Sequence, residues 1–585
     1  MKKIQTRIKA FASKTMVIGY CLLVIGMVSC TDTWNDHYDA GLPEGASAAS
    51  LWSTIQSDGN LNNFARVMEA TGYDAALSSS QVFTVFAPTD DQFTSAQADQ
   101  IVALYKQDKQ NNVKDKDNRA IKQFVQNHIA LYNHSVAKTG SDSVVMMNGK
   151  YLVLTPQTMG NSKVLSSNLL TANGILFTLD KKVDYFTNVF EALTEDEDLD
   201  SVGNFMTSFN EYEFLASESV AGGIEDGRTW YLDSVSVLTN DLFDYTDYIN
   251  SEDSVFWMVV PTNRVYNDLV AEYTNYFNYD SEVLKRDSLC WVKPRLAVIT
   301  GTVFSQTRNA KKVGEEYVWN TDSVMSVNAF NYNMRRYAWG RSDLAYYQYS
   351  KPFAEGGVFA NVEELVCSNG KVLKSDDWHL DKTMTFCQEK LVEGESRNYL
   401  DGVDETTTND PQYQSVGTWS PFYNQVSDNR FAMIAPRGQS NNEVRFKLPG
   451  LLSNVGYDIY AVFVPAVASD SLATDTVPCK FTASISYHHQ DGKQSAYCYL
   501  SESNPSLPAD STLSASARRS YITDPAKVDS VLLFDNFIFP TCSFDLNDTQ
   551  VILKLASNLR SAERRNNTYT ANMRIDCIIV KPHED

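Results

Sequence analysis

The short motifs that mark many catalytic sites are absent from this sequence of 585 residues. It contains no H-E-x-x-H, G-x-S-x-G, P-loop or G-x-G-x-x-G string, and no two of its seven histidines have the i, i+4 spacing of a helical metal site. We therefore expect no catalytic residue, no metal site and no cofactor, and a protein that is not an enzyme. A hydrolase whose carboxylate pair is assembled only by the fold remains a further hypothesis, because such a pair leaves no motif.

Basic residues are scarce as well. The 50 lysines and arginines are outnumbered by 72 aspartates and glutamates, so the formal net charge is −22. A surface of this sign repels phosphate backbones, and nucleic acid is not expected as a partner.

Cysteines give no metal or redox pattern. Cys21 and Cys30 belong to the N-terminal segment, and the other seven of the nine cysteines form no C-x-x-C pair. We expect these seven to be small buried apolar residues; the alternative, which an exported protein permits, is a disulfide among the last four.

The N-terminus lacks an apolar run long enough to cross a membrane. Five basic residues precede the apolar stretch Met16–Val28, which is shorter than the roughly 20 residues of a spanning helix. This pattern predicts a signal peptide over residues 1–29. Its removal takes away five positive charges and changes the net charge from −22 to −27.

The signal peptide runs into Met27-Val28-Ser29-Cys30, which resembles the lipobox of bacterial lipoproteins. The resemblance implies that Cys30 is lipidated and that residues 30–50 form a tether. Two or more acyl chains hold a protein stably at a membrane. Three aspartates after the cysteine resemble the signals of Bacteroidetes-type surface lipoproteins: Asp32, Asp36 and Asp39. The protein is therefore expected on the outer face of an outer membrane.

One phrase occurs twice in the sequence. Residues 83–93 read FTVFAPTDDQF and residues 256–266 read FWMVVPTNRVY. Each predicts a strand that ends at a proline and leads into a helix. In the first copy, Thr89 and Gln92 have the spacing of a capping box at the start of that helix.

Further landmarks follow both copies in the same order. Asn-Gly pairs at residues 173–174 and 369–370 predict tight turns between apolar runs. Between the landmarks, NHIALYNHSV (127–136) and RLAVITGTVF (295–304) each predict an apolar strand. The order indicates a tandem duplication with copies over residues 51–186 and 187–390.

This set of motifs resembles the fasciclin domain, an α+β module of extracellular adhesion proteins. The first copy is similar throughout, and its closing segment reads NGILFTLDKKV. The second copy keeps only the Pro-Thr and Asn-Gly landmarks, and Arg295 and Gly301 replace the two histidines His128 and His134. The resemblance implies two fasciclin-like α+β domains, the second divergent, and a structural role for the histidines of the first.

The remaining sequence predicts a different fold class. Residues 391–415 are polar, acidic and rich in threonine, which is typical of a linker or surface loop. Residues 416–585 contain about seven short apolar strands separated by turn residues and predict an antiparallel all-β sandwich. The last of them, MRIDCIIVKP, resembles the final strand of galactose-binding-like or jelly-roll modules.

Two features of the sandwich bear on binding. Trp419, Phe422 and Tyr423 lie in the loop sequence GTWSPFYNQ, where they form either a stacking platform for a ligand or a plug over the end of the sandwich. His488 and His489 alternate along a strand, which points them to opposite faces and predicts a solvated strand end.

Together these features predict a non-catalytic, lipid-anchored surface protein that binds a glycan, peptide or protein partner. It would be accessory to a SusC/SusD-type nutrient importer in the outer membrane. The alternative is a cell-surface or matrix adhesin without a role in nutrition.

Overall fold

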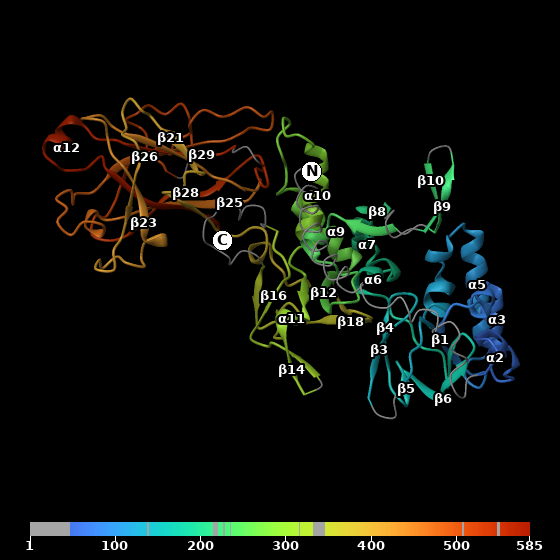
Figure 1. The fold of residues 1–585 in the computed structure, drawn as a ribbon. Coiled ribbons are helices and arrows are strands. Elements are labelled where there is room, and N and C mark those ends of the chain that lie inside the picture. The colour runs from blue at the N-terminus through green and yellow to red at the C-terminus, as the bar shows by residue number, and fades with distance from the viewer. Residues whose placement is uncertain are drawn as a thin grey trace. The chain divides into compact units, whose positions relative to one another are not determined.

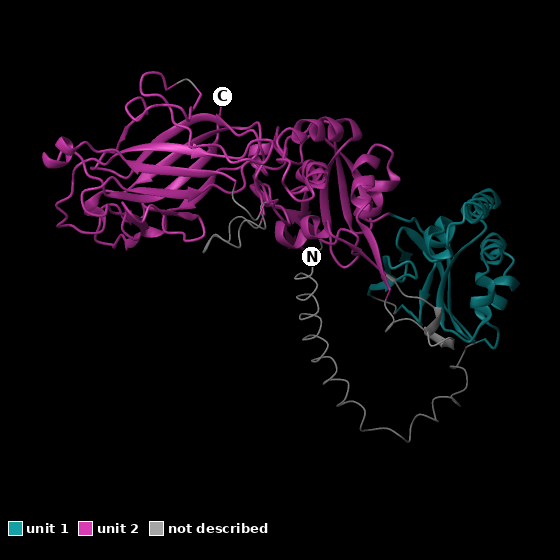
Figure 2. Cartoon of the chain, turned by 90° about the horizontal axis from the view of Figure 1, so that it is seen from above, with its two compact units in different colours: residues 1–186 teal, residues 187–585 magenta. Residues whose placement is uncertain are grey.

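The computed structural model describes residues 47–584, apart from residues 137–139, 215–219, 226–227, 234–235, 315, 331–345, 506–507 and 547–549. The chain forms two compact units, residues 1–186 and 187–585 (Figure 2). Lipidation at Cys30, the signal peptide and most of the tether lie outside the described residues. No helix in the described part combines the length and apolar character needed to cross a membrane.

The first unit is an α+β domain in which helices accompany one mixed sheet (Figure 1). Its sheet has the strand order β2-β1-β7-β6-β5-β4-β3. The main helices are α2 (Leu51–Ser57), α3 (Asn62–Thr71), α4 (Tyr73–Ser78) and α5 (Ser95–Gln110). The strands are β1 (Phe83–Pro88), β2 (Ile129–Leu131), β3 (Asp142–Val145), β4 (Tyr151–Leu154), β5 (Thr158–Met159), β6 (Ser162–Thr171) and β7 (Gly174–Leu179).

The second unit begins with another α+β part around a sheet of order β13-β12-β19-β18. Its strands are β12 (Phe256–Pro261), β13 (Val303–Ser305), β18 (Val362–Cys367) and β19 (Gly370–Ser375). Its main helices are α6 (Val189–Glu195), α7 (Asp200–Thr207), α9 (Asn263–Thr274) and α10 (Arg286–Ile299). Separate two-stranded sheets accompany it, among them β8 (Asn210–Phe214) with β11 (Ser236–Asn240) and β14 (Ala310–Val313) with β15 (Glu316–Trp319).

The two copies of the repeated phrase have the same strand register. Phe83 of β1 pairs in parallel with Gly174 of β7, and Phe256 of β12 pairs in parallel with Gly370 of β19. On the other side, β1 pairs antiparallel with β2, and β12 with β13. Both phrases therefore occupy the same position in their sheets.

The two Asn-Gly turns are equivalent as well. The Asn173 carboxamide oxygen accepts the N–H of Leu51 at 2.7 Å, and that of Asn369 accepts the N–H of Val189 at 2.8 Å. Each side-chain amide also donates to two carbonyls of the segment before the first strand of its sheet. These buried contacts tie the start of each copy to its closing hairpin.

The predicted capping box was wrong. Thr89 lies in a turn, and α5 begins later, with a capping box formed by Thr94 and Gln97. The position after Pro-Thr has a different role, because the Asp90 carboxylate accepts the N–H groups of Asn62 and Asn63 in the first turn of α3. Asn263 accepts the N–H of Ser201 in α7 in the same way. In both copies, the residue after Pro-Thr therefore caps an earlier helix of the same copy, α3 in the first and α7 in the second.

The predicted strand over residues 295–304 was partly wrong. Residues 295–299 complete helix α10, and only Val303–Ser305 form the strand β13. The apolar residues Leu296 to Ile299 are buried in either arrangement, which is why a short apolar run did not distinguish helix from strand.

The last part of the chain consists of two antiparallel sheets packed face to face (Figure 1). One has the order β22-β23-β30-β25-β28, and the other β21-β24-β29-β26-β27. The first contains β22 (Gln412–Ser415), β23 (Arg430–Ile434), β25 (Gly456–Phe463), β28 (Asp529–Ile538) and β30 (Met573–Pro582). The second contains β21 (Leu400–Val403), β24 (Glu443–Lys447), β26 (Lys480–Ser486), β27 (Tyr521–Ile522) and β29 (Ile552–Ser557).

The segment predicted as a linker, residues 391–415, belongs to this sandwich. It contributes β21 and β22, which pair with β24 and β23, while β20 (Lys390–Glu393) pairs with β30. These strands escaped prediction because β21 and β22 are edge strands of their sheets, where one side faces solvent and polar residues are tolerated.

The second α+β part and the sandwich share one hydrophobic core rather than forming separate bodies. Phe330 stacks on Phe544 of the sandwich with ring centroids 4.8 Å apart, and the Tyr279 hydroxyl donates to the Phe544 carbonyl. The Lys293 ammonium lies 2.6 Å from the Asp545 carboxylate. Residues 187–585 are therefore one compact unit.

Candidate functional site

The three predicted ring residues lie in the connection between β22 and β23, which we call the aromatic loop (residues 416–429). Trp419 is 56% exposed and Tyr423 is 38% exposed. Phe422 instead packs against a small satellite core formed by Val416, Val426, Phe431, Val464 and Ala468. Two rings are thus available to a ligand, and the third anchors the loop.

The aromatic loop is fixed by internal hydrogen bonds. The N–H groups of Ser420 and Tyr423 donate to the carbonyls of Gly417 and Ser420 at 2.9 and 3.1 Å. The Trp419 indole lies against Gly417, where an added Cβ would come within 2.5 Å of Nε1. The backbone of the loop is therefore ordered by its own hydrogen bonds.

A group of carboxylates lies at the base of the loop. Asp576, only 3% exposed, accepts the N–H of Ser427 with both oxygens at 3.0 and 3.2 Å. The Ser427 hydroxyl donates to Glu393 at 2.7 Å. Burial raises the pKa of Asp576 to about 7, and nearby Glu393 and Glu395 add to the shift. Burial also raises the pKa of Glu395.

A β-bulge accounts for the position of Asp576. Ala461 of β25 pairs with Ile578 and Phe463 with Ile575, so Val462 faces two residues of β30. The extra residue turns the Asp576 carboxyl toward the loop. No sequence pattern predicted this group, because Asp576 lies inside an apolar strand and its partners are distant in the chain.

A second polar surface lies on the outer face of the sheet that contains β24. The register aligns Gly402, Arg445, Lys554 and Ser484 in one row across four strands. The Lys554 ammonium lies 3.9 Å from the Tyr497 ring centroid. Ser484 is buried, and its hydroxyl has no hydrogen-bond partner. The charged residues that alternate along Glu443–Lys447 predict that one face of this strand meets solvent. The residues of the neighbouring strands that complete the row are known only from the strand register.

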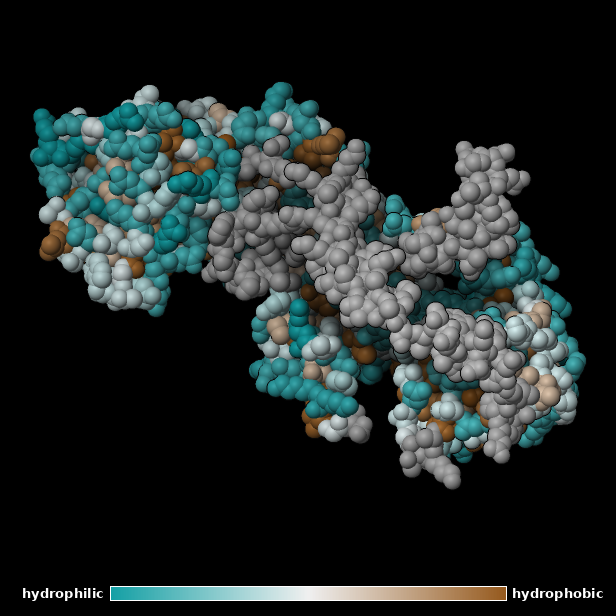
Figure 3. All heavy atoms as spheres, in the orientation of Figure 1, coloured by the Kyte–Doolittle hydropathy of each residue, from teal (hydrophilic) through white to brown (hydrophobic). Residues whose placement is uncertain are grey.

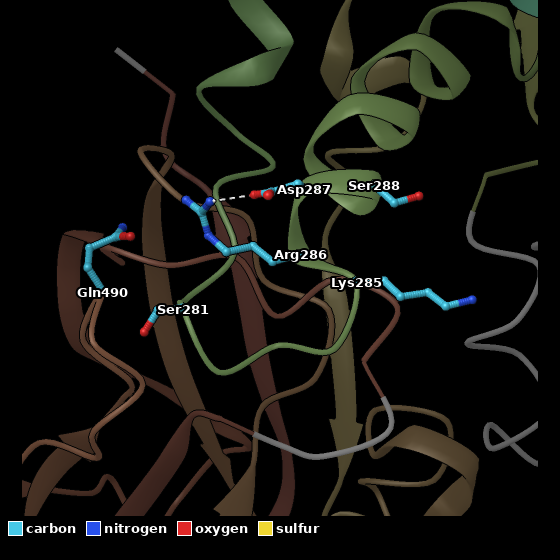
Figure 4. Close-up of a pocket in the computed structure, with 6 residues that line it drawn as sticks. All are labelled: Ser281, Lys285, Arg286, Asp287, Ser288 and Gln490. Carbon is cyan, nitrogen blue, oxygen red and sulfur yellow. Dashed lines mark hydrogen bonds and ion pairs between the residues drawn. The ribbon is translucent and has the colours of Figure 1, made fainter.

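Where the second α+β part meets the sandwich, the surface holds an open polar pocket of about 530 Å³ (Figure 4). It is lined by Ser281, Lys285, Arg286, Asp287, Ser288 and Gln490. The Arg286 guanidinium is already bound by Asp287 and by the Tyr279 carbonyl. The pocket is therefore a polar recess whose arginine is occupied within the protein.

The prediction of a solvated strand end was wrong for His488. Its Nδ1 lies 3.0 Å from Asp280, whose buried carboxylate also accepts from Gln550 at 2.6 Å. His489 is exposed. The second α+β part covers this end of the sandwich, and the sequence of the strand alone does not contain that contact.

The other histidine predictions concern the first unit. The buried His128 ring lies 2.7 Å from the Phe124 carbonyl through Nδ1, and its Nε2 accepts the N–H of Val183 at 3.0 Å. Burial lowers the pKa of His128 to about 4, so the ring is neutral and structural. All seven cysteines of the described part are free thiols, and six of them are buried as predicted.

Comparison with known proteins identifies one domain. Residues 59–183 match the Fasciclin domain family, so the first unit contains a fasciclin domain. No curated protein sequence matches the chain. Since the family match covers only the first copy, a second fasciclin domain stays a prediction, supported by the shared registers described above.

Solved structures with low similarity were also found. A FAS1 domain pair from the insect cell adhesion molecule fasciclin I is similar at 11% identity over 56% of this chain and 99% of that chain, with a TM-score of 0.18. A family 22 xylan-binding domain from Paenibacillus barcinonensis is similar at 10% identity over 34% of this chain and 94% of that chain, with a TM-score of 0.19. At TM-scores this low the likenesses carry no argument about function.

Proposed function

We propose that the protein is a non-catalytic surface lipoprotein that binds a glycan, peptide or protein partner through the aromatic loop of its sandwich. The observation that carries the proposal is the exposed Trp419 ring on a loop that is already ordered. Flat rings of this kind stack on sugars and on apolar side chains. The face of the sandwich seen in Figure 3 is mostly hydrophilic.

The proposal includes an accessory role beside a SusC/SusD-type nutrient importer, supported by the lipobox-like sequence before Cys30 and by the acidic tether. The fasciclin domain favours a second candidate, an adhesin without a role in nutrition. Deletion of the gene separates the two. Slower growth on a complex glycan with normal attachment supports the importer role, and the reverse result supports adhesion.

Trp419→Ala is expected to weaken binding by about 1–3 kcal/mol, or roughly 5- to 150-fold in Kd. Affinity electrophoresis through gels containing soluble polysaccharides measures the effect, and attachment to immobilised extracellular proteins covers the other ligand classes. The thermal midpoint should stay unchanged, because more than half of the ring is exposed.

Tyr248→Ala is the matched control, since this ring is 61% exposed and lies in the second α+β part. It should leave binding unchanged. Equal losses in the two variants, or a lowered thermal midpoint for Trp419→Ala, would show that the loop is not the binding site.

Cys30→Ala is expected to move the protein from the membrane fraction to the soluble fraction, because the acyl chains proposed on Cys30 provide the anchor. Cell fractionation followed by immunoblotting measures the shift. Cys21→Ala, inside the proposed signal peptide, should leave the protein in the membrane fraction. Persistence of the Cys30 variant with membranes would refute the anchor.

A further inference from the structure

Three potential metal ligands meet at one edge of the sandwich, away from the aromatic loop. Asp458, Asp535 and His583 each place one ligand atom within 4.8 Å of the others. They come from β25, from β28 and from the residue directly after β30, and are distant from one another in the sequence. No sequence motif therefore predicts the cluster.

Local backbone structure brings Asp535 into the cluster. Tyr457 pairs with Phe537 and Ile459 with Phe534, so Asp458 faces the two residues Asp535 and Asn536. This β-bulge puts Asn536 at a φ of 47° and directs its N–H to the Asp458 carboxylate at 2.9 Å. A bulge of this kind re-aims side chains, and here it directs Asp535 toward the other two ligands.

The donor distances suit a small divalent ion. The His583 Nδ1 lies 2.8 Å from the Asp458 Oδ1 and 3.7 Å from the Asp535 Oδ1. Two ligand atoms bound to one tetrahedral zinc ion are about 3.3 Å apart, given metal–ligand bonds of about 2.0–2.1 Å. Shifts of roughly half an ångström would therefore bring the imidazole nitrogen to this separation from each of the two carboxylates.

The charge balance also favours a cation. Two carboxylates face one imidazole in this cluster, so with both aspartates ionised it keeps a net negative charge whether or not the ring carries a second proton. The neighbouring cation Lys581 lies 2.9 Å from Glu584. A bound divalent ion would offset the repulsion between the two aspartates.

We propose that Asp458, Asp535 and His583 form a binding site for a divalent transition metal ion such as Zn²⁺. The imidazole selects this class, because Ca²⁺ and Mg²⁺ take oxygen ligands and larger coordination numbers. Three protein ligands leave a fourth position for water or for a group from a ligand. The ion would link β25, β28 and the end of β30.

Titration of the purified, EDTA-treated full chain with Co²⁺ tests the proposal, because cobalt replaces zinc and its visible absorption reports coordination. One equivalent should bind with a spectrum typical of nitrogen and oxygen ligands, and Zn²⁺ should displace it. Asp535→Asn and His583→Gln should each weaken binding by at least about tenfold. Zn²⁺ should raise the thermal midpoint of the unaltered chain, and Ca²⁺ should not.

His489→Gln is the control for an exposed imidazole outside the cluster, and it should bind Co²⁺ like the unaltered chain. The proposal is overturned if the unaltered chain binds no cobalt, if Asp535→Asn binds as tightly as the unaltered chain, or if the spectrum shows cysteine thiolate ligands. Circular dichroism of each variant verifies the fold, and His583→Gln serves as the deciding variant if Asp535→Asn misfolds.

Discussion

Asp576→Asn is expected to stabilise the protein at pH 8 and to remove a fall in stability that the unaltered protein shows as the pH rises from 3.8 to about 7. The folded protein holds a proton on the buried Asp576 carboxyl throughout this range, whereas the unfolded chain has released it. Stability therefore decreases as the pH rises toward the folded pKa and is constant above it. Asparagine is neutral at every pH, and its oxygen can still accept the N–H of Ser427.

The shift from 3.8 to about 7 corresponds to at most about 4 kcal/mol at pH 8. Urea unfolding of both proteins between pH 4 and pH 8 measures the effect. Asp108→Asn is a control with the opposite sign, because the hydrogen bond from Arg119 holds the pKa of buried Asp108 below its ordinary value. If Asp576→Asn is less stable than the unaltered protein at pH 8, burial of the ionised Asp576 carboxylate does not cost the folded protein stability.

Gly174→Ala and Gly370→Ala are expected to destabilise their own units severely, by more than about 3 kcal/mol. An added Cβ would lie 1.9 Å from the Phe83 carbonyl oxygen at Gly174 and 1.8 Å from the Phe256 carbonyl oxygen at Gly370. Both glycines also have positive φ, at 151° and 141°. The obstructing atoms belong to paired backbone, which cannot move aside without breaking the parallel ladder.

Limited proteolysis distinguishes the two variants. Gly174→Ala should expose the first unit to cleavage, and Gly370→Ala the second unit, which includes the sandwich. Gly438→Ala is the control, because its φ is 66° but no atom lies within 4 Å of the added Cβ. It should cost only about 1 kcal/mol. Near-normal stability of Gly370→Ala would contradict the described register.

The repeated phrase allowed the central strands of both sheets to be predicted from sequence, since apolar runs ending at proline and Asn-Gly turns have local causes. The helix start after the first phrase could not be predicted, because Thr89 and Thr94 both have a glutamine three residues later. Only the tertiary contact of Asp90 with α3 explains why the turn continues to Thr94. The edge strands of the sandwich were missed because β21 and β22 have no buried residue, and their polar side chains follow no alternating pattern.

Part of the proposed binding region could be predicted from the sequence and part could not. The composition of the loop indicated that rings gather there, and the structure places Trp419 and Tyr423 at the surface. That Phe422 is an anchor depends on Phe431 and Val464, which belong to other segments of the sandwich. Contacts between segments also determine the position of Asp576 and the pairing of His488 with Asp280, and none of them is visible as a local pattern.

The position of β30 has a consequence for biosynthesis. This strand, Met573–Pro582, lies in the interior of its sheet and pairs with β20, β23 and β25, yet the ribosome makes it after every other strand of the sandwich. Until that strand emerges, β23 and β25 have no strand between them to join the two halves of the sheet. A nascent chain that stalls earlier leaves open strand edges and an uncovered core, which are features that chaperones and proteases recognise. The sandwich can therefore fold completely only after residue 582, the end of β30, has been synthesised.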